Sequence, residues 1–260
     1  MRIVVGWDVG GAHLKAARAE NGRIVDAVQV ASPLRLGLEQ LARSFVEAKA
    51  RIGTADLHAV TMTGELADTF SSRVDGVEKL SALAVSELAP ARVSLYAGRG
   101  GFIAPQAARQ HADDIASANW FASASLAARA TSSALFVDMG STTTDLVPVV
   151  AGAIAARGYT DAERLAAGEL VYTGLVRSFV MAIADRAPFE GHWSALINEY
   201  FANMADVHRI LGALPDDADQ MAIAIGIRAV GAGVDVGNVV ARRAVGDSLL
   251  DVLEIGRAHV

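Results

Sequence analysis

Two short segments of the chain share one pattern, and this repeat constrains the possible fold more than any other feature. Residues 3–11 (IVVGWDVGG) and residues 135–141 (LFVDMGS) each contain an apolar run, an Asp, one further residue, a Gly and a small residue. Their aspartates, Asp8 and Asp138, lie 130 positions apart, and strand-like sequence follows each turn. A dinucleotide-binding βαβ loop would instead lead from its glycines into a helix. The repeat therefore predicts two strand–turn–strand units, each opening one half of an α/β protein.

The length allows one large domain or two modest ones; the repeat favours two, which we expect to span residues 1–130 and 131–260. The 260 residues are 52% hydrophobic and 20% charged, as in soluble globular proteins. A net charge of −6 without a Lys/Arg block argues against a nucleic-acid partner. The chain has no cysteine, and no two of its six histidines are spaced as zinc ligands on a helix, so neither disulfides nor zinc are expected. Without a signal peptide or a long apolar run, we expect a cytoplasmic protein with no membrane contact.

Periodicity predicts several elements between the two repeats. Apolar residues at helical spacing predict a helix over residues 34–52, closed by Gly53. The stretch "LHAVTMTGEL" predicts a strand that ends in a polar turn at residues 61–65, and "RVSLYAG" predicts another strand. Residues 113–130 are rich in small side chains, which predicts a closely packed helix before the second repeat.

The two turns have the chemistry of a phosphate site. Glycines let backbone N–H groups approach a ligand, and hydroxyls add further donors for phosphate oxygens. The two aspartates would hold Mg²⁺, directly or through water, because Mg²⁺ prefers oxygen ligands. A plain turn, a β-edge or a helix cap would explain either motif alone. The expected phosphate-binding residues are Gly10, Gly11, Lys15, Gly140, Ser141, Thr142, Thr143 and Thr144, although Lys15 would also suit a solvent-facing position.

The paired loops resemble those of the superfamily of actin, heat-shock ATPases and sugar kinases. Within it, "DVGGAHLKAA" and "VDMGSTTTDLVPV" resemble the hydantoinase/oxoprolinase-like branch. Four more motifs, "AVTMTGELADTF", "IASANWFASA", "RLAAGELVYTGLVRS" and "FANMADVHRILGALPDDAD", resemble the methanofuran-biosynthesis enzymes of methanogens and their relatives in methylotrophic bacteria. The resemblance covers most of residues 1–220. It implies two ribonuclease H-like domains of the actin-like ATPase/sugar kinase superfamily with an interdomain cleft.

The resemblance also implies an activity. These enzymes join an aminomethylfuran-methyl diphosphate to the phenolic oxygen of tyramine or its glutamyl derivative and release pyrophosphate. The implied partners are the small-molecule diphosphate and the phenolic amine, with Mg²⁺ as cofactor and ATP not favoured; a homodimer is left open. Two alternatives remain at this point: an ATP-dependent kinase or hydrolase using the same loops, and a phosphate- or nucleotide-binding protein without turnover.

Two residues are candidates for acting on the phenol. Glu65 follows the strand of "VTMTGEL" and would serve as the base, or it is simply an acid at a helix N-terminus. Asn119 precedes Asp138 by 19 residues, near where related phosphatases place a catalytic carboxylate. Since an amide is not a base, Asn119 would orient the substrate.

Three further residues are candidates for substrate contact. Trp120 would stack on a ring, or it is a core tryptophan. Glu169 and Tyr172, in "AAGELVYTG", would contact substrate, or they belong to an ordinary strand after a glycine turn.

The end of the chain departs from the family pattern. Family members usually continue longer, through a basic helical stretch and a later glycine-rich loop. Here Gly231-Ala232-Gly233 with "VGNVVARRAV" is either that loop drawn closer by a deletion or part of a shortened second domain.

Overall fold

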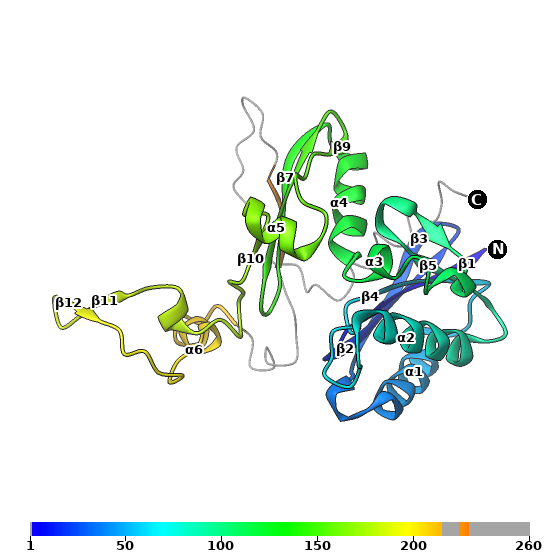
Figure 1. Ribbon diagram of the computed structural model, residues 1–260, viewed down its shortest axis with the longest axis horizontal. Helices are drawn as coiled ribbons and strands as arrows, with labels where there is room; N and C mark the ends of the chain where they lie inside the picture. The colour runs from blue at the N-terminus through cyan, green and yellow to red at the C-terminus, as the bar shows by residue number, and fades with distance from the viewer. Residues whose placement is uncertain (1, 215–223, 229–260) are drawn as a thin grey trace. The chain divides into compact units, whose positions relative to one another are not determined.

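A computed structural model describes residues 2–214 and 224–228 of the chain. These residues divide into two compact units, one ending at Arg129 and the other beginning at Ala130 (Figure 1). No helix in the described part of the chain combines the length and apolar character needed to cross a membrane.

The first unit is built on a six-stranded mixed sheet with the strand order β3-β2-β1-β4-β5-β6. The inner strands β1, β4 and β5 run parallel, while β2, β3 and β6 pair antiparallel with their neighbours. The strands are β1 (Ile3–Val9), β2 (His13–Glu20), β3 (Arg23–Ala31), β4 (Leu57–Met62), β5 (Arg92–Tyr96) and β6 (Phe102–Ile103).

Helices cover both faces of this sheet. The first, α1, packs on β2 and β3, and α2 packs on β4 and β5 (Figure 1). The N-terminal residues of α4 pack on the other face, where Ala122 joins Ala59 and Tyr96 in a small cluster. The helices are α1 (Leu38–Ile52), α2 (Arg73–Leu88), α3 (Ala112–Ile115) and α4 (Asn119–Ala130).

Strand alternation decides which side chains meet the main core. Successive residues of a strand point to opposite faces. Val5, Trp7 and Val9 of β1 join the core under α1 and α2. Asp8 therefore points to the other face, together with its register partners on the two neighbouring strands, Lys15 and Thr61.

Two of the expected helices differ from the structure. The segment at residues 34–52 starts as a short 3₁₀ turn, and α1 proper begins only at Leu38, because Gly37 has a φ of 120°. The single helix expected at residues 113–130 is two helices, α3 and α4. Ser117 separates them with a left-handed φ of 53°, a conformation that no apolar pattern predicts.

A buried histidine lies on the core face of β4. The Trp7 Nε1–H donates a 3.0 Å hydrogen bond to Nδ1 of His58, which fixes the neutral ring with its proton on Nε2. Burial, with the nearby Lys49 charge as a second cause, lowers the pKa of His58 from 6.5 to about 4. The folded state thus prefers the neutral ring, and protonation favours unfolding.

This pKa shift predicts acid sensitivity. The stabilisation is complete above pH 6.5, the unfolded value, and is lost as the pH falls through about 4, the folded value. The difference between the unfolded and folded pKa values of His58 corresponds to a loss of about 3 kcal/mol of unfolding free energy once the ring is protonated in both states. We expect His58→Gln to flatten the dependence of the unfolding free energy between pH 6.5 and 4, measured by urea denaturation. His192→Gln, at an exposed position of the second unit, is the control and should leave the pH dependence of the unfolding free energy unchanged. An unchanged pH dependence in His58→Gln would contradict the lowered pKa of His58.

The second unit contains an antiparallel sheet with the order β10-β8-β7-β13, to which β9 adds beside β8. A hairpin, β11–β12, turns at Glu190 and Gly191, both with positive φ. Capping boxes start α5 and α6, at Thr160 with Glu163 and at Asn203 with Asp206. The elements are β7 (Ser133–Met139), β8 (Thr144–Val150), β9 (Ala153–Ile154), α5 (Asp161–Ala167), β10 (Leu170–Val171), β11 (Arg186–Phe189), β12 (His192–Ala195), α6 (Met204–Ile210) and β13 (Ala224–Arg228).

Candidate functional site

The carboxylate of Asp8 is the centre of a polar row in the first unit. Lys15 Nζ lies 3.3 Å from Asp8 Oδ2 and balances its charge. Asp8 is 6% exposed, and its second oxygen, Oδ1, has no hydrogen-bond partner among the described residues; the same holds for the buried Thr61 hydroxyl. A buried carboxylate oxygen normally has a partner. The Asp8 oxygen therefore suits a cation or an ordered water.

The two turns of the repeat close in the same way. The Gly10 N–H donates to the His13 carbonyl at 3.0 Å, and the Gly140 N–H donates to the Thr143 carbonyl at 2.8 Å. The registers also match, since Asp8 faces Lys15 across its hairpin and Asp138 faces Asp145 across the other. The repeat seen in the sequence is thus a repeat of backbone geometry.

The closure decides which amides remain for a ligand. The N–H groups of Gly10 and Gly140 are used inside their turns. Those of Gly11 and Ala12, and likewise those of residues 141–143, donate to no protein acceptor in the described part of the chain. Consecutive amides of this kind form an anion-binding concavity. The amide that follows each turn glycine therefore suits a phosphate better than the amide of the glycine itself.

In the second unit, Asp145 lies opposite Asp138 and forms an ion pair with Arg164. Arg164, 1% exposed at α5, donates to Asp145 Oδ1 at 2.6 Å. Burial raises the pKa of Asp145, although the Arg164 charge and hydrogen bond act in the opposite direction. Neither residue was singled out from the sequence, although strand alternation places Asp145 on the face of Asp138. Asp145 carries the ion pair that anchors α5, so its carboxylate has a structural role; Asp138 stays the ligand predicted from the sequence.

Glu65 and the segment leading to Asn119 lie together in the first unit. The loop after β4 is tied to the first turn, because the Thr63 and Gly64 N–H groups both donate to the Val9 carbonyl at 3.0 Å. Glu65, next in this loop, is 1% exposed, and Ser117 Oγ donates to its Oε1 at 2.9 Å.

The left-handed conformation of Ser117, which separates α3 from α4, also positions its side chain. It turns a hydroxyl toward the buried carboxylate and starts α4 at Asn119, which is half-buried. Asp8 and Glu65 both lie at the carboxyl ends of parallel strands, the edge where α/β sheets bind ligands.

Gly174 contacts the second turn directly. A Cβ there would lie 2.6 Å from backbone atoms of Ser141 and Thr142, a distance that no side chain tolerates. Thr144 adds a hydrogen bond of 2.5 Å from its Oγ1 to the Thr173 carbonyl. The segment after β10 therefore fixes the shape of the turn, and Thr144 is a structural member of it.

We expect Gly174→Ala to destabilise the protein by about 1–3 kcal/mol, as overpacking does elsewhere. Gly11→Ala is the matched control, since a Cβ at Gly11 has nothing within 4 Å and should change stability by less than about 0.5 kcal/mol. Thermal denaturation of both variants measures the difference. Equal melting temperatures would show that the 141–142 backbone shifts freely.

The remaining candidates for substrate contact take three different positions. Trp120 is 3% exposed and packs edge-on against Phe121, with ring centroids 5.3 Å apart. Glu169 is 6% exposed, and its two oxygens accept the N–H groups of Arg157 and Gly158 at 2.8 and 2.9 Å. Tyr172 is 65% exposed. These positions favour a core role for Trp120 and a loop-anchoring role for Glu169.

The described residues contain no group of three or more His, Cys, Asp or Glu side chains arranged as a metal site. Any Mg²⁺ would thus depend on few protein ligands, as is usual for a cation that keeps several waters and binds through substrate phosphates. The glycine-rich stretch Gly231–Gly233 lies outside the described residues.

Comparison with known proteins gives the family. The hydantoinase/oxoprolinase family model matches residues 56–218. A curated protein of Methanocaldococcus jannaschii is 31% identical over 218 residues, which are 83% of this chain and 64% of that protein. The chain belongs to the hydantoinase/oxoprolinase family. The matched range of this family includes Glu65, Asn119 and the second turn, while Asp8 and the first turn precede it.

Two relatives of this hydantoinase/oxoprolinase protein carry one name. The M. jannaschii protein is called "(4-{4-[2-(gamma-L-glutamylamino)ethyl]phenoxymethyl}furan-2-yl)methanamine synthase". The protein of the same name from Methanococcus vannielii is 38% identical over 82 residues, 32% of this chain and 36% of that protein. The chain thus spans less than two thirds of the length of these relatives.

Among solved structures, the polyphosphate/ATP-glucomannokinase of an Arthrobacter strain is 13% identical with a TM-score of 0.35. That match covers 65% of this chain and 72% of the kinase.

Proposed function

We propose that this protein is a Mg²⁺-dependent transferase that joins an aminomethylfuran-methyl diphosphate to the phenolic oxygen of tyramine or its glutamyl derivative. The observation that carries the proposal is the 31% identity, over most of this chain, to a synthase whose name describes such an aryl ether. The proposed reaction forms a bond between the phenolic oxygen and the furan-bearing methylene carbon. It breaks the bond from that carbon to the diphosphate, which leaves as pyrophosphate.

The turns supply the groups that a diphosphate needs. Unbonded amides at Gly11 and Ala12, and at residues 141–143, suit the negative oxygens of the leaving group. Lys15 stands beside Asp8 and adds a positive charge in the same row. We propose Mg²⁺ at Asp8 because its Oδ1 is buried and has no hydrogen-bond partner among the described residues; Asp138 stays the predicted ligand in the second turn. When bound, the cation would stabilise charge on the departing diphosphate.

The phenol requires a proton acceptor. Glu65 is a carboxylate at the same strand edge as Asp8, and Ser117 fixes its orientation through one oxygen. In this proposal Glu65 takes the phenolic proton as the ether bond forms. Asn119, at the start of α4, orients the phenolic substrate.

The decisive assay measures pyrophosphate release together with product mass, with purified protein, Mg²⁺, the furan-bearing diphosphate and tyramine, in the presence and absence of ATP. We expect pyrophosphate and the aryl ether in equal amounts without ATP. Strict dependence on ATP, with ADP formed in step with product, would overturn the proposal in favour of a kinase-like activity. Binding of the diphosphate without any product would indicate a phosphate-binding protein.

A further inference from the structure

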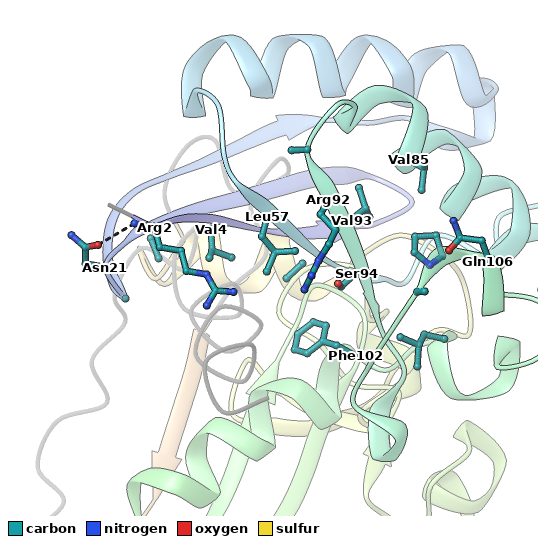
Figure 2. Close-up of a pocket in the computed structure, with 17 residues that line it drawn as sticks. Arg2, Val4, Asn21, Leu57, Val85, Arg92, Val93, Ser94, Phe102 and Gln106 are labelled. Atoms are coloured by element: carbon teal, nitrogen blue, oxygen red, sulfur yellow. Dashed lines mark hydrogen bonds between the residues drawn. The ribbon is translucent and has the colours of Figure 1, made fainter. Parts of the chain in front are cut away.

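A cavity lies in the first unit, at the end of the sheet away from Asp8. It has a volume of about 740 Å³ and opens on the face that Gly6 and Ala59 share. Its wall comes from the first residues of the parallel strands, and its other side from the chain around β6 (Figure 2). Arg2 precedes Asp8 by six residues of extended chain, about 20 Å, so the end of the cavity that Arg2 borders lies far from the Asp8 carboxylate.

The wall of the cavity is apolar. Its main side chains are aliphatic or aromatic, and three of them are almost completely removed from solvent although nothing in the described chain fills the space beside them. These wall residues are Val4, Ala19, Leu57, Ala59 and Phe102. A volume of this size is typical of a site for a small organic molecule.

Two guanidinium groups border this apolar wall. Arg2 directly precedes β1, and Arg92 is the first residue of β5. Both side chains extend toward the space beside Leu57 and Phe102 (Figure 2). Both are exposed, and neither forms an ion pair with an acidic side chain in the residues that the structure describes.

We propose that this cavity binds a small amphipathic carboxylate, with its carboxylate held by Arg2 and Arg92 and its apolar body against Leu57 and Phe102. A planar guanidinium matches a carboxylate in geometry and charge, whereas it would repel an amine. Burial of the apolar wall under an aromatic or aliphatic group of the ligand adds favourable binding free energy. The site is separate from the proposed transferase site and does not depend on it.

The test compares two probes of the same shape. Naphthalene-1-acetate carries the carboxylate, and naphthalene-1-acetamide is its neutral counterpart; both are titrated into the full chain by calorimetry. We expect the acetate to bind at least about tenfold more tightly than the amide, since ionic contacts with guanidinium groups add to the same apolar contact. Equal affinities, or no binding of either probe at millimolar concentration, would overturn the proposal. No binding of either probe would also be the result if another part of the chain or a second copy covered the cavity.

Variants assign the binding to this cavity. Arg2→Gln and Arg92→Gln should each weaken acetate binding about fivefold or more and leave binding of the amide unchanged. Arg43→Gln, which removes one exposed arginine from α1 on the opposite side of the sheet, is the matched control and should have no effect. Saturating Mg²⁺ and pyrophosphate should not compete with the acetate; competition, or identical binding in all three variants, would place the probe elsewhere.

Discussion

Glu65→Gln is expected to lower the rate of ether formation by about 10²–10⁴-fold, the range for loss of a general base. The amide keeps the shape of the side chain, and its oxygen can still accept the 2.9 Å hydrogen bond from Ser117. It cannot accept the phenolic proton. Binding of the diphosphate should change little, because the turn amides and Lys15 remain. Single-turnover kinetics and pyrophosphate binding separate the two effects.

Glu169→Gln is the control for loss of a buried carboxylate. Glu169 accepts two main-chain N–H groups, so one of them would face an amide NH₂ group in the variant. We expect a loss of about 1–3 kcal/mol of stability, with the chemistry retained in the protein that stays folded. Activity in Glu65→Gln equal to that of the unchanged protein would remove Glu65 from the mechanism. A melting temperature lowered as far as in Glu169→Gln would indicate a structural role.

The contrast between the two glutamates shows what the sequence could predict. Both follow a short run of small or polar residues near a strand, and both allow a functional and a structural interpretation. The difference lies in their partners: a serine hydroxyl 52 positions away for Glu65, and backbone amides for Glu169. Such partners depend on how loops meet in space, which periodicity does not encode.

The repeat was more informative, because it concerns local backbone geometry. An Asp, one residue and a Gly after an apolar run specify a strand end and a tight turn, and both hairpins form with matching registers. The strands at Leu57–Met62 and Arg92–Tyr96 followed from the same kind of pattern, although the first extends two residues into the polar turn expected at residues 61–65. The left-handed Ser117 and the contact of Gly174 with the second turn depend on tertiary packing, so no local pattern predicts them.

Asp8→Asn is expected to lower Mg²⁺-dependent turnover by about 100-fold or more, equivalent to several kcal/mol of lost charge stabilisation. The change removes one negative charge and keeps the side-chain volume. It should also raise the Mg²⁺ concentration needed for half-maximal rate, because the unsatisfied Oδ1 belongs to the proposed ligand. The measurement is pyrophosphate release across a Mg²⁺ titration. Asp68→Asn, at an exposed position of the same unit, is the control and should match the unchanged protein.

Lys15 makes this prediction sharper, because it lies 3.3 Å from the Asp8 carboxylate and has two possible roles. If it only balances Asp8, then Lys15→Met should strengthen Mg²⁺ binding, since the cation no longer competes with the ammonium group. If it contacts the diphosphate, the same variant should weaken diphosphate binding by several-fold. Asp8→Asn leaves the ammonium group without its partner, so melting temperatures must accompany the rates. An Asp8→Asn protein that is folded and keeps the original Mg²⁺ dependence would exclude Asp8 as a metal ligand, whatever the role of Lys15.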